Sequence, residues 1–194
     1  MTRALARTVS ILGHPTIVLP LSVLALTLQR AGGRQAAWMV AGFVMLAAMV
    51  MAYSKWQVRR GRWSHVDASE LAEREALNRF LLIALGVATL LALAVGAPLE
   101  HALGLSLAAA IVLLALRTQA RCKLSLHTAF VVYAAVLLGA TSMVALVVGL
   151  GFAGLVAWSR LSLQRHEPRD LVAGAVAGCV AGLLFHAAAW YWTR

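Results

Sequence analysis

The sequence SRLSLQRHEPRD, residues 159–170, is a charged island between two long apolar runs. The run before it, residues 128–158, holds 31 residues, and the run after it, residues 171–192, is long enough to cross a bilayer as one helix. Backbone N–H and C=O groups inside a bilayer must be paired within the chain. Because these runs do not alternate with period two, they predict transmembrane helices and not strands.

The composition of the whole chain indicates the same class of protein. Of its 194 residues, 62% are hydrophobic and 12% are charged, which excludes a soluble domain of ordinary composition. The formal net charge is +10, and it indicates anionic headgroups or anionic substrates, not nucleic acid, because no soluble basic domain is predicted. The two cysteines, Cys122 and Cys179, form neither a metal-binding pattern nor a disulfide framework.

Further apolar runs predict the remaining membrane helices. They cover about residues 11–28, 36–53, 80–97 and 102–116. Pro15 and Pro20 predict an irregular start to the first run, and residues 139–142 (GATS) predict a turn that divides the 31-residue run into two short helices. We therefore expect an all-α, polytopic membrane protein with six or seven transmembrane helices. We expect residues 1–194 to form one domain, in which residues 1–53 supply the first two spans.

The last run carries a stripe of small residues, Gly174, Gly178 and Gly182, which is typical of a packed membrane helix and is expected to pack inside the monomer. His186 in the same run is expected to be bonded to a neighbouring helix. Residues 98–101 (PLEH) are expected to form only a short turn.

The charged island contains residue types that suit phosphoryl chemistry. Arg160 offers a planar set of donors that matches phosphate oxygens, and His166 can act as nucleophile or proton carrier near neutral pH. If a helix begins near Pro168, His166 lies in the preceding turn and Asp170 in the first turn. Asp170 could then hold the proton-bearing nitrogen of His166 and fix its tautomer. The alternative is a loop that only contacts lipid headgroups.

Two other polar clusters can contribute to such a site. Lys55 and Arg62 are seven residues apart, which on a helix would place both cations on one side. Ser125 and His127 lie where a membrane helix begins, and the exposed N–H groups of a helix start favour a bound anion. Ser125 can donate to a phosphate oxygen, and His127 can protonate a leaving group. A basic collar at the membrane edge and a helix N-cap are the alternatives.

The number of spans between these clusters places all three at one face of the membrane, the face of the N-terminus. Most of the cations lie there: Arg3, Arg7, Lys55, Arg59, Arg60, Arg62, Arg74, Arg79, Arg117, Arg121, Lys123, Arg160, Arg165 and Arg169. The opposite face keeps Arg30, Arg34 and Arg194. The positive-inside rule therefore predicts a cytoplasmic site in a protein of the plasma membrane.

Together, the clusters resemble the motifs of the type 2 phosphatidic acid phosphatase (PAP2) family, K-x6-R-P, P-S-G-H and S-R-x5-H-x3-D. The corresponding residues are Lys55-x6-Arg62-Trp63, Leu124-Ser125-Leu126-His127 and Ser159-Arg160-x5-His166-x3-Asp170. The third motif is complete. The first motif lacks its proline, and the second motif lacks its proline and its glycine. Proline and glycine determine backbone shape, so these departures concern the shape of the loops and not the groups that carry chemistry. The resemblance extends from about residue 55 to the C-terminus.

The resemblance implies a helical bundle like that of PAP2 enzymes and vanadium haloperoxidases, with the phosphatase core in residues 54–194. It implies a lipid phosphatase that needs no metal or other cofactor, in which His166 attacks phosphorus and forms a phosphohistidine. Asp170 would orient His166, and His127 would protonate the leaving group. The residues implied to bind the phosphoryl oxygens are Lys55, Arg62, Ser125 and Arg160.

The expected substrate is a lipid phosphate or diphosphate with a small headgroup and a tail that stays in the bilayer. Polyprenyl phosphates or diphosphates and phosphatidate-type lipids both qualify. Two alternatives stay open, namely a phosphotransferase on the same scaffold and a non-catalytic lipid-phosphate transporter or binding protein. The oligomeric state is left open between monomer and dimer.

Overall fold

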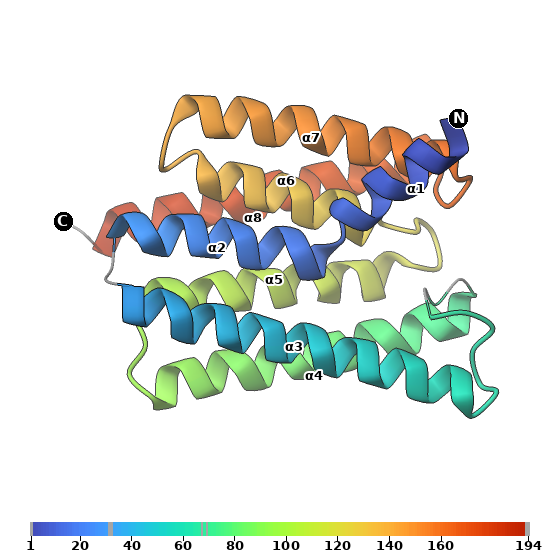
Figure 1. Ribbon diagram of the computed structural model, residues 1–194, viewed down its shortest axis with the longest axis horizontal. Helices are drawn as coiled ribbons and strands as arrows, with labels where there is room; N and C mark the ends of the chain where they lie inside the picture. The colour runs from blue at the N-terminus through green and yellow to red at the C-terminus, as the bar shows by residue number, and fades with distance from the viewer. Residues whose placement is uncertain (1, 31–32, 67, 69, 193–194) are drawn as a thin grey trace.

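The apolar runs of the sequence form helices that lie side by side along the long axis of the molecule (Figure 1). The structure, a computed structural model, describes residues 2–30, 33–66, 68 and 70–192. In these residues the chain forms the helices α1 (Thr2–Leu12), α2 (Pro15–Arg30), α3 (Gly33–Arg59), α4 (Leu71–Ala94), α5 (Leu99–Thr118), α6 (Leu126–Leu138), α7 (Met143–Ser162) and α8 (Pro168–Trp192). The described residues contain no strand, which confirms the all-α prediction.

Five of the described helices, α3, α4, α5, α7 and α8, are long and apolar enough to cross a membrane. A sixth candidate span is the pair α1 and α2, which is bent by 48° at the break before Pro15, where the sequence predicted an irregular start. Large apolar side chains such as Ile83, Leu90 and Val147 are exposed, as lipid-facing residues are. These features are compatible with a multi-pass membrane protein of five or six spans, fewer than the upper number expected from the sequence.

Helix α6 is shorter than a span and is enclosed by neighbouring helices. It has 13 residues, and its residues 128–137 are all buried among α2, α5, α7 and α8. The predicted turn at residues 139–142 is present, and the Ser142 hydroxyl caps α7 by accepting the Ala145 N–H at 3.0 Å. His186 joins α8 to α6, since its Nε2 lies 2.7 Å from the Val136 carbonyl oxygen and must donate to it. The predicted bond of His186 to a neighbouring helix is thus confirmed.

The glycine stripe of α8 lets its backbone approach that of α6. A Cβ atom on Gly174 would lie 2.6 Å from the Ser125 carbonyl oxygen, and one on Gly178 would lie 2.1 Å from the Ala129 carbonyl oxygen. Both are distances that no side chain tolerates. The stripe therefore packs within the monomer, as expected, and it fixes the start of α8 against the start of α6.

Replacing Gly178 by alanine is expected to lower the thermal midpoint of the detergent-solubilised protein, because backbone atoms of α6 must move to make room. Overpacking of this kind costs about 1–3 kcal/mol of unfolding free energy. Gly154→Ala in α7 is the matched control, since nothing lies within 4 Å of the added methyl group. Equal midpoints for Gly178→Ala and Gly154→Ala would show that the close approach of α6 and α8 is not present.

Three polar connections lie at one end of the bundle, which is also the end of the N-terminus (Figure 1). They join α3 to α4, α5 to α6, and α7 to α8. The predicted placement of the three clusters at one face therefore agrees with the arrangement of the helices.

One expectation at this end is wrong. Lys55 and Arg62 do not share one side of a helix, because α3 ends at Arg59, between them. Gly61 adopts a φ of +67°, the Gly61 N–H donates to the Val58 carbonyl oxygen at 2.9 Å, and the Arg62 N–H donates to the Gln57 carbonyl oxygen at 3.0 Å. This pair of bonds is the Schellman motif, which a glycine in the left-handed region allows. The helix therefore stops before Arg62.

Candidate active site

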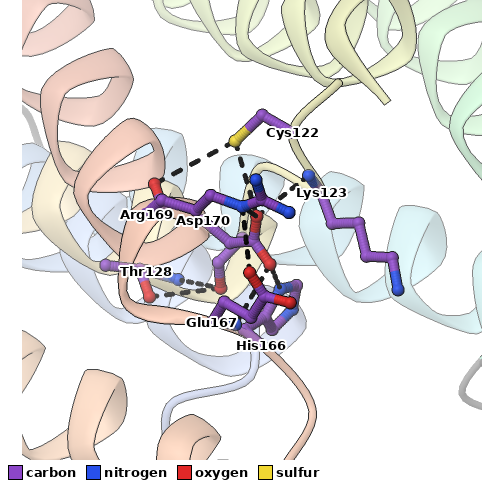
Figure 2. Close-up of polar contacts among 8 residues, drawn as sticks. Cys122, Lys123, Thr128, His166, Glu167, Arg169 and Asp170 are labelled. Carbon is purple, nitrogen blue, oxygen red and sulfur yellow. Dashed lines mark hydrogen bonds and ion pairs between the residues drawn. The ribbon is translucent and has the colours of Figure 1, made fainter. Parts of the chain in front are cut away.

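The carboxylate of Asp170 is the buried centre of the candidate site, with 1% of the residue exposed. Because α8 begins at Pro168, Asp170 lies in its first turn, and its Oδ2 accepts the Glu167 N–H at 3.1 Å. Its Oδ1 accepts the Lys123 N–H at 3.0 Å and lies 3.5 Å from Cys122 Sγ (Figure 2). Burial and the bond to Asp170 raise the pKa of the Cys122 thiol, which keeps it protonated as a donor.

Backbone contacts join this carboxylate to the second motif. The Ser125 N–H donates to the Asp170 carbonyl oxygen at 3.1 Å, so the loop before α6 is bound to the start of α8. The Ser125 side chain is fully buried, and its hydroxyl oxygen lies 3.4 Å from the Thr128 nitrogen and 3.2 Å from Thr128 Oγ1. In this structure Ser125 is therefore the N-cap of α6. Its contact with phosphate remains a prediction.

His166 lies in the turn before α8, as predicted, with its Nδ1 3.5 Å from Asp170 Oδ2 (Figure 2). The two atoms are close enough for electrostatic attraction, although their alignment is too poor for a hydrogen bond. A carboxylate on this side favours the tautomer with its proton on Nδ1, which leaves the lone pair of Nε2 on the other side of the ring. Asp170 thus favours a His166 ring whose Nε2 is unprotonated and faces away from the carboxylate.

Burial lowers the pKa of His166 to about 4, and the positive charge of Arg160 adds to this effect, while Asp170 opposes it. A histidine whose pKa is lowered in the folded protein loses its proton at a lower pH than free histidine does. His166 is therefore neutral from about pH 5 upward.

Carbethoxylation, which requires a neutral imidazole, is expected to follow this low pKa. Labelling of His166 by diethyl pyrocarbonate, located by peptide mass spectrometry, should reach half its maximal rate near pH 4, because the folded pKa is about 4. A denatured sample should reach half its maximal labelling rate near pH 6.5, the ordinary pKa of histidine. The proton concentration at this midpoint is about 300-fold lower than at the midpoint of the folded protein. Coincident profiles for the folded and denatured protein would contradict the buried, cation-facing environment of His166.

The polar residues face a cavity of about 520 Å³. His127, at the start of α6, and Arg160, in the last turn of α7, line it together with His166. The lining continues along α2 from Pro15 to Thr27, a rise of 12 residues and therefore about 18 Å of helix. Most of the remaining lining is apolar, with side chains of α3, α4, α5 and α6 such as Phe43, Leu81, Leu105 and Phe130. The cavity is therefore polar at the loop end and apolar along its length.

The opposite end of this cavity contains Glu100 and His101. These residues were expected to form only a turn, but they belong to the first turn of α5, because Pro98 stands at its N-cap and not inside it. The prediction that residues 98–101 form only a turn is therefore wrong. The cavity reaches both ends of the bundle.

Arg160 is held in place by the N-terminal helix. Its Nη1 donates to Ser10 Oγ at 2.9 Å, and Ser10, in α1, is 8% exposed. The contact is possible because α1 packs on α7. The chain comes close to α7 directly after α1, since a Cβ atom on Gly13 would lie 2.3 Å from Val156 Cγ2. A helix outside the three motifs therefore positions a cation of the third motif.

Not all of the predicted cations reach the cavity. Lys55 and Arg62 are exposed and do not line it, and the Arg62 guanidinium lies over the Trp56 ring, 5.8 Å from its centroid. Their contact with phosphate remains a prediction. Arg74 of α4 and Lys123 of the loop before α6 line the cavity with Arg160. Only Lys123 had a sequence signal, its position beside the second motif, and Arg74 had none beyond its charge.

His14 is a further cavity residue that the motifs do not indicate. It lies at the break between α1 and α2, and its ring meets the His127 ring edge to face at a centroid distance of 4.9 Å. The single sequence signal for it is the proline that follows. The cavity therefore contains three histidines at its polar end: His14, His127 and His166.

Comparison of the chain with protein families, with curated proteins and with solved structures finds no match. In the part of the chain that the structure describes, no three His, Cys, Asp or Glu side chains are grouped so that they could hold a metal ion.

Proposed function

We propose that the protein is a membrane-embedded lipid phosphatase that acts through a phosphohistidine on His166. The observation that carries the proposal is the pairing of His166 with buried Asp170 at the cationic end of a mostly apolar cavity. The motif order that resembles the PAP2 family supports the same reaction. The substrates that fit are polyprenyl phosphates or diphosphates and phosphatidate-type lipids.

In the first step, His166 Nε2 attacks phosphorus and the bond from phosphorus to the lipid oxygen breaks. His127, which lines the same end of the cavity, donates a proton to the departing oxygen. Burial and the nearby Arg160 lower the pKa of His127, and the negative charge of a bound phosphate raises it, so His127 takes up this proton when the anionic substrate binds. Arg160 and the other cations of the lining offset the charge on the phosphoryl oxygens, which is the main requirement of phosphoryl transfer. With a lipid monophosphate, the products of this step are a lipid alcohol and a phosphohistidine. With a diphosphate, His166 attacks the terminal phosphorus, the bridging P–O bond breaks, and a lipid monophosphate leaves.

In the second step, water attacks phosphorus and the bond between nitrogen and phosphorus breaks. His127 lost its proton in the first step, so it can now accept one from the attacking water. Phosphate leaves, and both histidines return to their starting states. No group other than water is consumed.

The apolar length of the cavity suits the lipid tail. The lining along α2 gives about 18 Å of mostly apolar wall beneath the cationic end. A tail in this space would keep the phosphate at the membrane surface, where the loop residues lie. A small headgroup fits because the described residues at the polar end are connections between helices and helix ends, not a folded domain that could bind a large headgroup.

The site is proposed to face the cytoplasm of the plasma membrane. The loop end of the bundle carries most of the Lys and Arg residues, and the two termini lie at opposite ends (Figure 1). A reporter fused to the N-terminus should be accessible only from the cytoplasm, and one at the C-terminus only from outside. The reverse pattern would place the site outside.

Phosphate release from defined lipids tests the proposal directly. The full chain in detergent, with EDTA present, is given a polyprenyl phosphate, a polyprenyl diphosphate and phosphatidate. We expect release from at least one lipid and equal rates with and without EDTA. Loss of activity in EDTA would reject the metal-independent mechanism. If an added alcohol receives the phosphoryl group in place of water, the protein is a phosphotransferase, and if lipid is bound but not cleaved, the binding-protein alternative holds.

A further inference from the structure

His14 is held by its own bonds at the start of α2. Its carbonyl oxygen accepts the Val18 N–H at 3.1 Å, and its Nδ1 lies 3.3 Å from the Thr16 nitrogen and 2.7 Å from Thr16 Oγ1. These are the contacts of an N-cap residue, followed by proline at the first helical position. Because Nδ1 accepts from a backbone N–H, the ring cannot turn over without losing the cap. His14 therefore presents a fixed ring at the break between α1 and α2.

The fixed ring of His14 packs against His127. The two planes meet at 88°, with 4.9 Å between ring centroids, and both residues line the cavity. This is the edge-to-face geometry that aromatic pairs prefer. His127 stands in the first turn of α6, and within the described residues its ring makes no hydrogen bond that could fix it in the same way. The edge-to-face contact with His14 therefore restricts its orientation.

We propose that His14 is a positioning residue, which holds the His127 ring in the direction required for proton transfer to the leaving oxygen. The inference rests on the proposed phosphatase function for the role of His127. It adds to that function a contribution from the N-terminal segment, which lies outside the three motifs. Proton donors must be aligned with the departing atom, and a displacement of about 1 Å can cost about a hundredfold in rate.

Two substitutions separate the ring of His14 from its capping role. His14→Asn keeps a cap, because asparagine is among the best N-cap residues, but it removes the ring. His14→Phe keeps a ring beside His127 but removes both nitrogens and the cap. His65→Asn and His65→Phe are the matched controls, because His65 is exposed and does not line the cavity. Thermal midpoints of all four variants identify any that fail to fold.

The leaving group distinguishes a role through His127 from a general loss of structure. With an alkyl phosphate, whose leaving oxygen needs a proton, His14→Asn should lower kcat about ten- to a hundredfold. With p-nitrophenyl phosphate, whose leaving group departs without a proton, kcat should fall less than threefold, since the general acid contributes little there. His14→Phe, which keeps the ring but loses the bonds that fix it, should be faster than His14→Asn on the alkyl phosphate and within threefold of the wild type on p-nitrophenyl phosphate. In the background of His127→Ala, His14→Asn should have no further effect on the alkyl phosphate.

Each departure from this pattern overturns the inference. Equal losses on the two substrates would assign His14 to the structure in general. If His14→Phe is as slow as His14→Asn on the alkyl phosphate although it is folded, a ring nitrogen is required and His14 acts on the substrate or a proton itself. Losses that multiply in the double variant would show that His14 acts independently of His127.

Binding of orthovanadate, a mimic of the phosphoryl transition state, tests the same coupling without turnover. Calorimetry of the wild type, His14→Asn, His127→Ala and the double variant should show weaker binding in each, about tenfold, with no added loss in the double variant. If the wild type binds vanadate but cleaves neither substrate, the proposed function fails and this cycle alone decides the role of His14. Vanadate affinity that His14→Asn leaves unchanged, or no binding by the wild type, would overturn the inference.

Discussion

Replacing His166 by alanine is expected to abolish phosphate release, with a fall in kcat of about ten-thousand-fold or more. The structure gives the reason, since His166 is the histidine whose Nδ1 faces a buried carboxylate while the ring lines the cavity. Without its imidazole no group occupies the attacking position, and water would have to attack the lipid phosphate directly. The measurement is phosphate release in detergent from the lipid that the wild type cleaves fastest.

Two controls make this result specific. His65→Ala removes an exposed histidine from the same end of the bundle and should leave kcat unchanged. Added imidazole should restore part of the activity of His166→Ala, because it can enter the vacated space and accept the phosphoryl group. Wild-type activity in His166→Ala would reject the mechanism, whatever lipid is used.

Replacing Asp170 by asparagine is expected to lower kcat by about a thousand- to ten-thousandfold and also to lower stability. An amide cannot accept at both ends. The Asp170 carboxylate accepts both the Glu167 N–H and the Lys123 N–H. In the asparagine variant, the NH2 group would face one of these two N–H groups, so two donors would point at each other. A buried donor without an acceptor costs about 1–3 kcal/mol of unfolding free energy. The negative charge that favours a proton on His166 Nδ1 would also be lost, so the tautomer with a reactive Nε2 would be less populated.

Glu167→Gln is the matched control for this substitution. Glu167 is adjacent in the same turn, but its side chain is 68% exposed, so the change from carboxylate to amide should alter kcat less than threefold and leave the thermal midpoint unchanged. The account would be contradicted if Asp170→Asn kept wild-type kcat, since His166 would then not depend on the carboxylate. A loss of stability with full activity would assign Asp170 to the loop structure alone.

The sequence predicted those features of the fold that follow from local pattern. The lengths of the apolar runs predicted the helices, the GATS segment predicted the break between α6 and α7, and Pro168 predicted the start of α8. The short spacing from His166 to Asp170 sufficed to predict their proximity, because four residues across a helix start leave few arrangements. The glycine stripe predicted close packing but not its partner, which the structure shows to be α6.

Other features depend on contacts between distant segments and could not be predicted in this way. The spacing of Lys55 and Arg62 suggested one helix face, but it contained no account of the left-handed turn at Gly61. The pairing of His14 with His127 joins residues more than 100 positions apart, and it depends on how α2 packs against α6. The Arg160 contact with Ser10 depends in the same way on the packing of α1 on α7. Such contacts leave no periodic pattern in a single sequence.

The most direct test of the central claim is to trap the phosphoryl group on the protein. The wild type is mixed with a lipid phosphate labelled in its phosphate, quenched in alkali within milliseconds, digested and analysed by mass spectrometry, because phosphohistidine survives alkali and is lost in acid. The account predicts one labelled histidine, His166, and no label in His166→Ala. Label on His127 or His14, or turnover with no labelled peptide at all, would contradict it.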